Sequence, residues 1–112
     1  MATSINFPDI LTEIKNGIVD LAKSTVSNYL NEAKKDAQSL LTEMKDDLER
    51  WTNLLAQGLL TTEDFEWLVN SEKDTVKMAA LEQAGLAAIR IDQFKSSLLN
   101  LIVDTVFKAI KI

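Results

Sequence analysis

Apolar residues recur through the first half of the chain at alternating steps of four and three positions. This first ladder consists of Ala22, Val26, Tyr29, Ala33, Ala37, Leu40, Met44, Leu48, Trp51 and Leu55. The mean step is about 3.67 residues, an eleven-residue repeat that is typical of a long, nearly straight α-helix. Upstream, Asn6, Pro8 and Asp9 form a helix-start signal, because proline and a carboxylate both suit the first turn. The pattern predicts one helix over residues 8–57.

A turn signal ends this helix and starts another. Gly58 fits the position after a helix C-terminus, where the left-handed conformation costs glycine little. Thr61 is a good N-cap, and Asp64 occupies the third helical position in a capping-box-like role. Leu60 and Phe65 stand at the two positions of a hydrophobic staple. The spacing predicts that a second helix begins directly after Thr61.

The stretch Leu54–Phe65 also resembles the helix–glycine–threonine–acid–acid–phenylalanine hairpin of the bacterial short C-terminal domains. The resemblance covers about a dozen of the 112 residues. It implies a helical hairpin at this position. Caps and staple account for that hairpin in physical terms, so no family function is carried over to the chain.

A second ladder with the same period follows the turn. It consists of Val76, Ala80, Ala84, Ala87, Ile91, Phe94, Leu98, Ile102, Val106 and Ala109. When the chain is folded at the turn, residues whose numbers sum to about 120 face each other, so that Met44 meets Val76 and Ala22 meets Leu98. We therefore predict an all-α fold in one domain, 1–112. It is a long antiparallel hairpin with helices over 8–57 and 62–111.

Four places could interrupt the long helices. Asn16–Gly17 and the polar stretch 31–36 lie in the first helix, and Asn70–Ser71 and Gly85 lie in the second. Breaks near 31 and 85 would convert the hairpin into a compact monomeric four-helix bundle. We favour continuous helices, because the eleven-residue phase passes through both places and a turn usually resets the phase.

The residue types present exclude much chemistry. The chain contains no histidine and no cysteine, which excludes disulfides, zinc fingers, cysteine or histidine nucleophiles and histidine-ligated haem. Carboxylates cluster at 43–47 and 63–66, but they lack a calcium-loop pattern and have basic neighbours. We expect these clusters to be solvated helix faces. We predict no catalytic residue, no metal, no cofactor and no enzyme activity.

The net charge and the first residues of the chain restrict the binding partners and the cellular location that we expect. The net charge is −5 and the 12 basic residues are scattered singly, so we expect no nucleic-acid binding. Residues 1–10 lack the basic and apolar regions of a signal peptide, and no apolar run approaches the length of a transmembrane helix. We therefore expect a cytoplasmic protein.

The two ends of the chain carry more apolar surface than one antiparallel partner covers. This apolar base consists of Ile10, Ile14, Ile18, Leu99, Val103, Phe107 and Ile110. The flanks are neutral overall, whereas residues 31–77 carry 11 acidic and 6 basic side chains. We expect the bases of two hairpins to pack as a four-helix core. A homodimer or higher oligomer is thus the first prediction, and a different helical protein partner is the second.

Aromatic residues flank the turn. Trp51, Phe65 and Trp67 form a tip. Packing of their rings against each other is the first interpretation, and a partner-binding knob on an acidic tip is the second. Arg90 and Lys95 are isolated basic residues in an apolar region, and we expect them to snorkel or to pair with acids on the first helix.

These observations favour a non-enzymatic helical module for self-assembly or protein interaction, such as a scaffold, an adaptor or a small chaperone-like protein. The alternative is an amphipathic protein that associates with lipid or another hydrophobic surface, because eleven-residue amphipathic repeats also suit helices lying on an interface. The polar faces are not lysine-rich, so a membrane surface is the less favoured partner.

Overall fold

The computed structural model describes residues 6–111. Its α-helices are α1 (Phe7–Thr25), α2 (Leu30–Ala56), α3 (Thr62–Ser71), α4 (Ala79–Gln83) and α5 (Ala88–Ala109). Two 3₁₀ turns lie between them, η1 (Ser27–Tyr29) and η2 (Glu72–Asp74). The described part of the chain contains no strand, and the predicted all-α class is confirmed.

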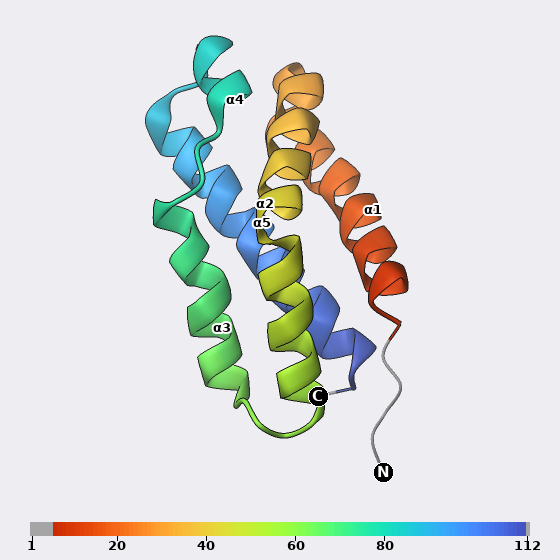
Figure 1. The fold of residues 1–112 in the computed structure, drawn as a ribbon. Helices are drawn as coiled ribbons and strands as arrows, with labels where there is room; N and C mark the ends of the chain where they lie inside the picture. The colour runs from red at the N-terminus through yellow and green to blue at the C-terminus, as the bar shows by residue number, and fades with distance from the viewer. Residues whose placement is uncertain (1–5, 112) are drawn as a thin grey trace.

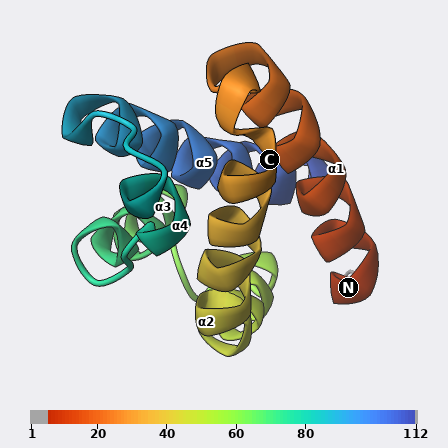
Figure 2. The same ribbon diagram turned by 90° about the horizontal axis from the view of Figure 1, so that it is seen from above.

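The helices form a bundle in which the predicted hairpin is folded back on itself. α1 and α2 run antiparallel, α3 and α4 follow each other along the other flank of α2, and α5 crosses behind them (Figures 1 and 2). The longest dimension of the molecule is 49 Å, whereas a continuous helix over 8–57 would be roughly 70 Å long. The prediction of continuous helices over 8–57 and 62–111 is therefore wrong, and the chain has the breaks of the compact alternative.

The first break lies at residues 26–29. Residues 24–28 are weak helix formers, because β-branched side chains lose rotamer freedom in a helix and serine and asparagine compete for backbone hydrogen bonds. The Ser24 and Thr25 hydroxyls both donate to the Leu21 carbonyl oxygen, at 3.0 and 2.7 Å. Local propensity thus permits a turn that the apolar spacing alone does not indicate.

The second helix is interrupted over residues 72–87. Gly85 follows α4 with φ +92°, a left-handed conformation that glycine adopts without a Cβ penalty. The Gly85 N–H donates to the Glu82 carbonyl oxygen at 3.1 Å, and the Leu86 N–H donates to the Leu81 carbonyl oxygen at 3.2 Å. These bonds end α4 and turn the chain into α5.

Two contacts between helices of the bundle agree with the register of the predicted hairpin. A Cβ added to Gly17 of α1 would stand 2.9 Å from Leu101 Cδ1 of α5. The Asp36 carboxylate of α2 accepts a hydrogen bond from the Ala80 N–H of α4 at 3.0 Å. These pairs of residue numbers sum to 118 and 116, close to the predicted value of about 120.

Folding back gives the bundle one internal apolar core. The largest fully buried side chains come from all five α-helices and the α3–α4 connection: Ile14, Ile18, Leu40, Met44, Leu48, Phe65, Met78, Leu81, Phe94, Leu98, Leu99 and Ile102. The chain therefore covers by itself the apolar stripe that a single long hairpin would leave exposed. Within residues 6–111, no helix has both the length and the hydropathy to cross a membrane.

Candidate functional site

The α2–α3 hairpin forms one end of the molecule (Figure 1). Gly58 has φ +75°, and the Leu59 N–H donates to the Leu54 carbonyl oxygen at 2.9 Å, which closes the C-terminus of α2. The Thr61 hydroxyl oxygen accepts a hydrogen bond from the Asp64 N–H at 3.0 Å, which caps α3. The turn predicted from the caps is confirmed.

The three aromatic residues of the tip lie in different environments. Trp51 and Phe65 are buried, at 8% and 0% exposure, whereas Trp67 is 71% exposed. Phe65 packs against Phe107 of α5, with ring centroids 5.7 Å apart and planes tilted by 45°. Trp67 points away from this contact, because two residues along an α-helix rotate a side chain by about 200°. The first interpretation, in which the tip aromatics pack together, is therefore wrong for Trp67.

Trp67 stands on the solvent face of the hairpin, and Leu59 of the turn is 70% exposed. Glu63 and Asp64 precede Trp67 by four and three residues, so they are its neighbours on the surface of α3. Residues 61–74 carry five acidic side chains and one basic side chain. The hairpin thus presents a large exposed ring in a negative electrostatic environment.

The apolar base belongs to the internal core. Five of its residues are 0 to 4% exposed and two are partly buried: Ile10, Ile14, Ile18, Leu99 and Val103, then Phe107 and Ile110. α1 carries Ile10, Ile14 and Ile18, and it packs against α5, which carries Leu99, Val103 and Phe107. The expectation that the base is left uncovered is wrong for the single chain, because the hairpin folds back over it. Homodimerisation stays a prediction.

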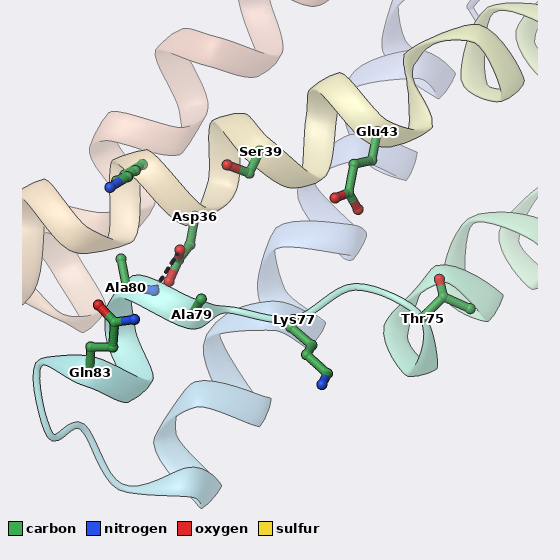
Figure 3. Close-up of a pocket in the computed structure, with 9 residues that line it drawn as sticks. Asp36, Ser39, Glu43, Thr75, Lys77, Ala79, Ala80 and Gln83 are labelled. Atoms are coloured by element: carbon green, nitrogen blue, oxygen red, sulfur yellow. Dashed lines mark hydrogen bonds between the residues drawn. The ribbon is translucent and has the colours of Figure 1, made fainter.

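A groove of about 480 Å³ lies between α2 and the segment 75–83, with Asp36 in its wall (Figure 3). Asp36 is 4% exposed. Its carboxylate oxygens accept hydrogen bonds from the Ala80 N–H at 3.0 Å and the Leu81 N–H at 2.8 Å. These N–H groups belong to the first turn of α4 and have no partner within that helix. A side chain of α2 therefore caps α4 from 44 residues away.

The groove has a lining of mixed charge. Lys35, Lys77 and Glu43 line it beside Asp36, and the Lys77 side chain points away from Asp36 (Figure 3). Asp36 already binds two N–H groups, so its carboxylate serves as a structural anion and is not positioned as a general base. Across residues 6–111, no group of three or more acidic side chains is arranged to hold a metal ion.

Two cationic side chains, Lys95 and Arg90, donate hydrogen bonds to backbone carbonyl groups near the two breaks in the predicted helices. Lys95 is 8% exposed, and its Nζ donates to the carbonyl oxygens of Lys73, at 2.9 Å, and Val76. Arg90 donates from its guanidinium group to the Thr25 carbonyl oxygen at 2.9 Å, at the end of α1. Within residues 6–111 neither cation pairs with an acid of the first helix, so that part of the expectation is wrong. Lys95 is buried and does not snorkel, whereas Arg90 is exposed, which is compatible with snorkelling. Arg90 binds a carbonyl group where α1 ends, and the backbone dipole there favours a cation.

The acidic clusters lie on solvent-facing helix surfaces, as predicted. Glu43 and Asp46 are exposed, and the partly buried Asp47 forms an ion pair with Arg50 at 3.0 Å on the same helix. The second cluster is exposed throughout: Glu63, Asp64 and Glu66.

Sequence reasoning missed the role of Asp36. This residue stands three positions after Ala33 and four before Leu40, which places it on the buried face of α2. An acidic residue on a buried face needs a partner. That position was the available signal, although the partner lies too far along the chain for spacing to identify it.

The described part of the chain is thus a small all-α bundle whose acidic hairpin exposes Trp67 and Leu59 at one end. Comparison with known protein families, with curated proteins and with solved structures finds no match for the chain. We therefore infer function from the contacts of the chain itself.

Proposed function

We propose that this chain is a non-enzymatic protein-interaction module that binds a basic, amphipathic segment of a partner at its α2–α3 hairpin. The observation behind the proposal is the 71% exposure of Trp67, in a chain whose other tryptophan, Trp51, is 8% exposed. Tryptophan is enriched among the residues that dominate binding energy at interfaces. A large ring that contributes little to the chain's own core is available for such a contact.

The charge around Trp67 selects the chemistry of the partner. Five acidic residues in 61–74 favour a segment that carries lysine or arginine, and a cation can also lie over the indole ring. Leu59, 70% exposed in the adjoining turn, offers a second apolar contact. A helix with basic and leucine residues on one face combines both requirements.

The test uses a synthetic amphipathic peptide of leucine and lysine, titrated into the protein by calorimetry. We expect binding to the natural chain and a loss of at least about tenfold in affinity for Trp67→Ala, the effect of removing a dominant interface residue. Ile89→Ala is the matched control, because Ile89 is 68% exposed and lies on α5, outside the hairpin. A peptide with glutamate in place of lysine should not bind.

Circular dichroism establishes that each variant is folded before titration. The proposal is wrong if the natural chain does not bind the basic peptide. It is also wrong if Trp67→Ala and Ile89→Ala bind it equally well, because the contact would then not involve the hairpin.

A further inference from the structure

The α1–α2 connection differs from the turns that follow α2 and α4. Those two turns contain Gly58 and Gly85, whose φ values of +75° and +92° cannot belong to a continued helix. Residues 26–30 contain neither glycine nor proline, and none of them has a positive φ. No residue in this connection is therefore of a type that prevents it from becoming helical.

The apolar phase also continues through this connection. Ala22, Val26 and Ala33 are buried, and Tyr29 between them is partly buried. They are consecutive members of the first ladder, at steps of four, three and four residues. If residues 26–29 became helical, α1 and α2 would merge into one helix with an unbroken apolar stripe. The same sequence thus suits both a folded-back and an extended conformation.

Two features hold α1 in the folded-back position. α1 packs against α5 and α2, the most extensive contacts between helices in the bundle. Arg90 binds the Thr25 carbonyl oxygen at 2.9 Å. In an extended helix, that carbonyl would instead accept a hydrogen bond from the backbone N–H four residues on. The packing of α1 would be restored in full if α1 took the equivalent place in a second copy of the chain.

We propose that residues 26–29 are a hinge across which two copies of this chain exchange α1. In the dimer, α1 of each copy packs on α2 and α5 of the other, and α1 and α2 of each copy form one helix. Short hinges that restrain a folded-back element are the usual sites of such exchange. The exchange goes beyond the proposed function and does not depend on it, although a dimer would present two Trp67 hairpins to a partner.

Two substitutions at the hinge should shift the equilibrium between the folded-back and the extended form in opposite directions. In the folded-back turn the backbone hydrogen bonds are donated by Val26 and Tyr29, so the Ser27 N–H takes no part in them. In an extended helix the Ser27 N–H would donate to Lys23. Ser27→Pro removes that bond and clashes with that carbonyl, while proline is tolerated at the first position of η1. Asn28→Ala favours the extended form, because alanine has the higher helix propensity.

The measurement is the molar mass by light scattering after unfolding and refolding at high protein concentration. We expect the natural chain to give a species of twice the 12.5 kDa chain mass. Asn28→Ala should lower the dimer dissociation constant by about tenfold, because each of two hinges gains helix propensity. Ser27→Pro should give only monomer with the circular dichroism of a folded helical chain.

A cysteine pair shows whether α1 has been exchanged. The chain has no cysteine of its own, and Gly17→Cys with Leu101→Cys places two thiols across the α1–α5 contact, where the Leu101 side chain approaches position 17 within 2.9 Å. Oxidation of the exchanged dimer should link two chains, visible as a dimer on a non-reducing denaturing gel. Two intact bundles that merely associate would give links within single chains.

Any one of three results would overturn the proposed exchange. The natural chain and the Asn28→Ala variant could both be monomeric after refolding, or the Ser27→Pro variant could still form a dimer. The third such result is that the disulfide crosslinks form only within single chains. None of these variants alters Trp67 or Leu59. Failure of peptide binding and failure of the exchange are therefore separate outcomes.

Discussion

Replacement of Asp36 by asparagine tests whether a side chain of α2 holds α4 in place. Asp36 is 4% exposed and accepts hydrogen bonds from the N–H groups of Ala80 and Leu81, at 3.0 and 2.8 Å. Asparagine keeps the size of the side chain, but it has one acceptor oxygen in place of two and carries no charge. One N–H of α4 would then face an amide NH₂ group, which cannot accept a hydrogen bond.

The size of the expected loss of stability follows from the cost of leaving a buried hydrogen-bond donor without an acceptor. A hydrogen bond to a charged group contributes about 1.5–3 kcal/mol, and a buried donor without a partner costs a similar amount. We therefore expect Asp36→Asn to lower the free energy of unfolding by about 2 kcal/mol. For a domain of this size, that change corresponds to a fall in Tm of roughly 8 °C. Asp46→Asn removes the same charge from the exposed face of α2 and should change stability by less than about 0.5 kcal/mol.

The assay is urea unfolding followed by circular dichroism, combined with amide hydrogen exchange at Ala80 and Leu81. Asp36→Asn should lower the unfolding midpoint and accelerate exchange at both amides, because α4 opens more often when its cap is weakened. Equal stability of Asp36→Asn and Asp46→Asn, or unchanged protection of the α4 amides, would refute the reasoning.

Two further substitutions test buried polar groups, each by the free energy of unfolding in urea. Thr52 is fully buried and, in the described part of the chain, its hydroxyl has no hydrogen-bond partner, so Thr52→Val should stabilise the fold by about 1 kcal/mol. Thr105→Val is the control and should be destabilising, because the Thr105 hydroxyl donates to the Leu101 carbonyl oxygen at 2.7 Å. Lys95→Met leaves two carbonyl oxygens without their donor and should cost about 2 kcal/mol. Lys45→Met, on an exposed face, should cost less than about 0.5 kcal/mol.

Features set by nearby residues were predictable from the sequence. The ladders predicted the helical class, because it depends on spacing along one helix face. The hairpin turn was predictable for the same reason: Gly58, Thr61 and Asp64 make its caps with groups at most five residues apart. The exposure of Trp67 was anticipated as the second interpretation of the tip, but spacing alone did not distinguish it from packing against Trp51.

The positions of the breaks depend on contacts between residues that lie far apart in the sequence, which the pattern within a short stretch does not contain. Asp36 binds N–H groups 44 and 45 residues away, Lys95 binds carbonyl groups 22 and 19 residues away, and Arg90 binds one 65 residues away. The eleven-residue phase favours continuous helices because it records only which positions are apolar. It contains no information on the groups that satisfy a backbone when a helix stops.

Apolar burial explains why the chain folds back, and polar caps explain where. Burial of an isoleucine or leucine side chain contributes about 1.5–3 kcal/mol. The stabilisation from burying the five buried residues of the apolar base therefore exceeds the stabilisation lost with the few helical hydrogen bonds at a break, at about 1 kcal/mol each. A second copy of the chain could supply the same burial, so burial alone does not choose between the folded-back and exchanged forms. The segment 72–87 is fixed by Asp36, Lys95 and the conformation of Gly85, whereas the turn at 26–29 has Arg90 as its long-range cap. The difference in the number of these contacts is why the hinge is expected at the first break and not at the second.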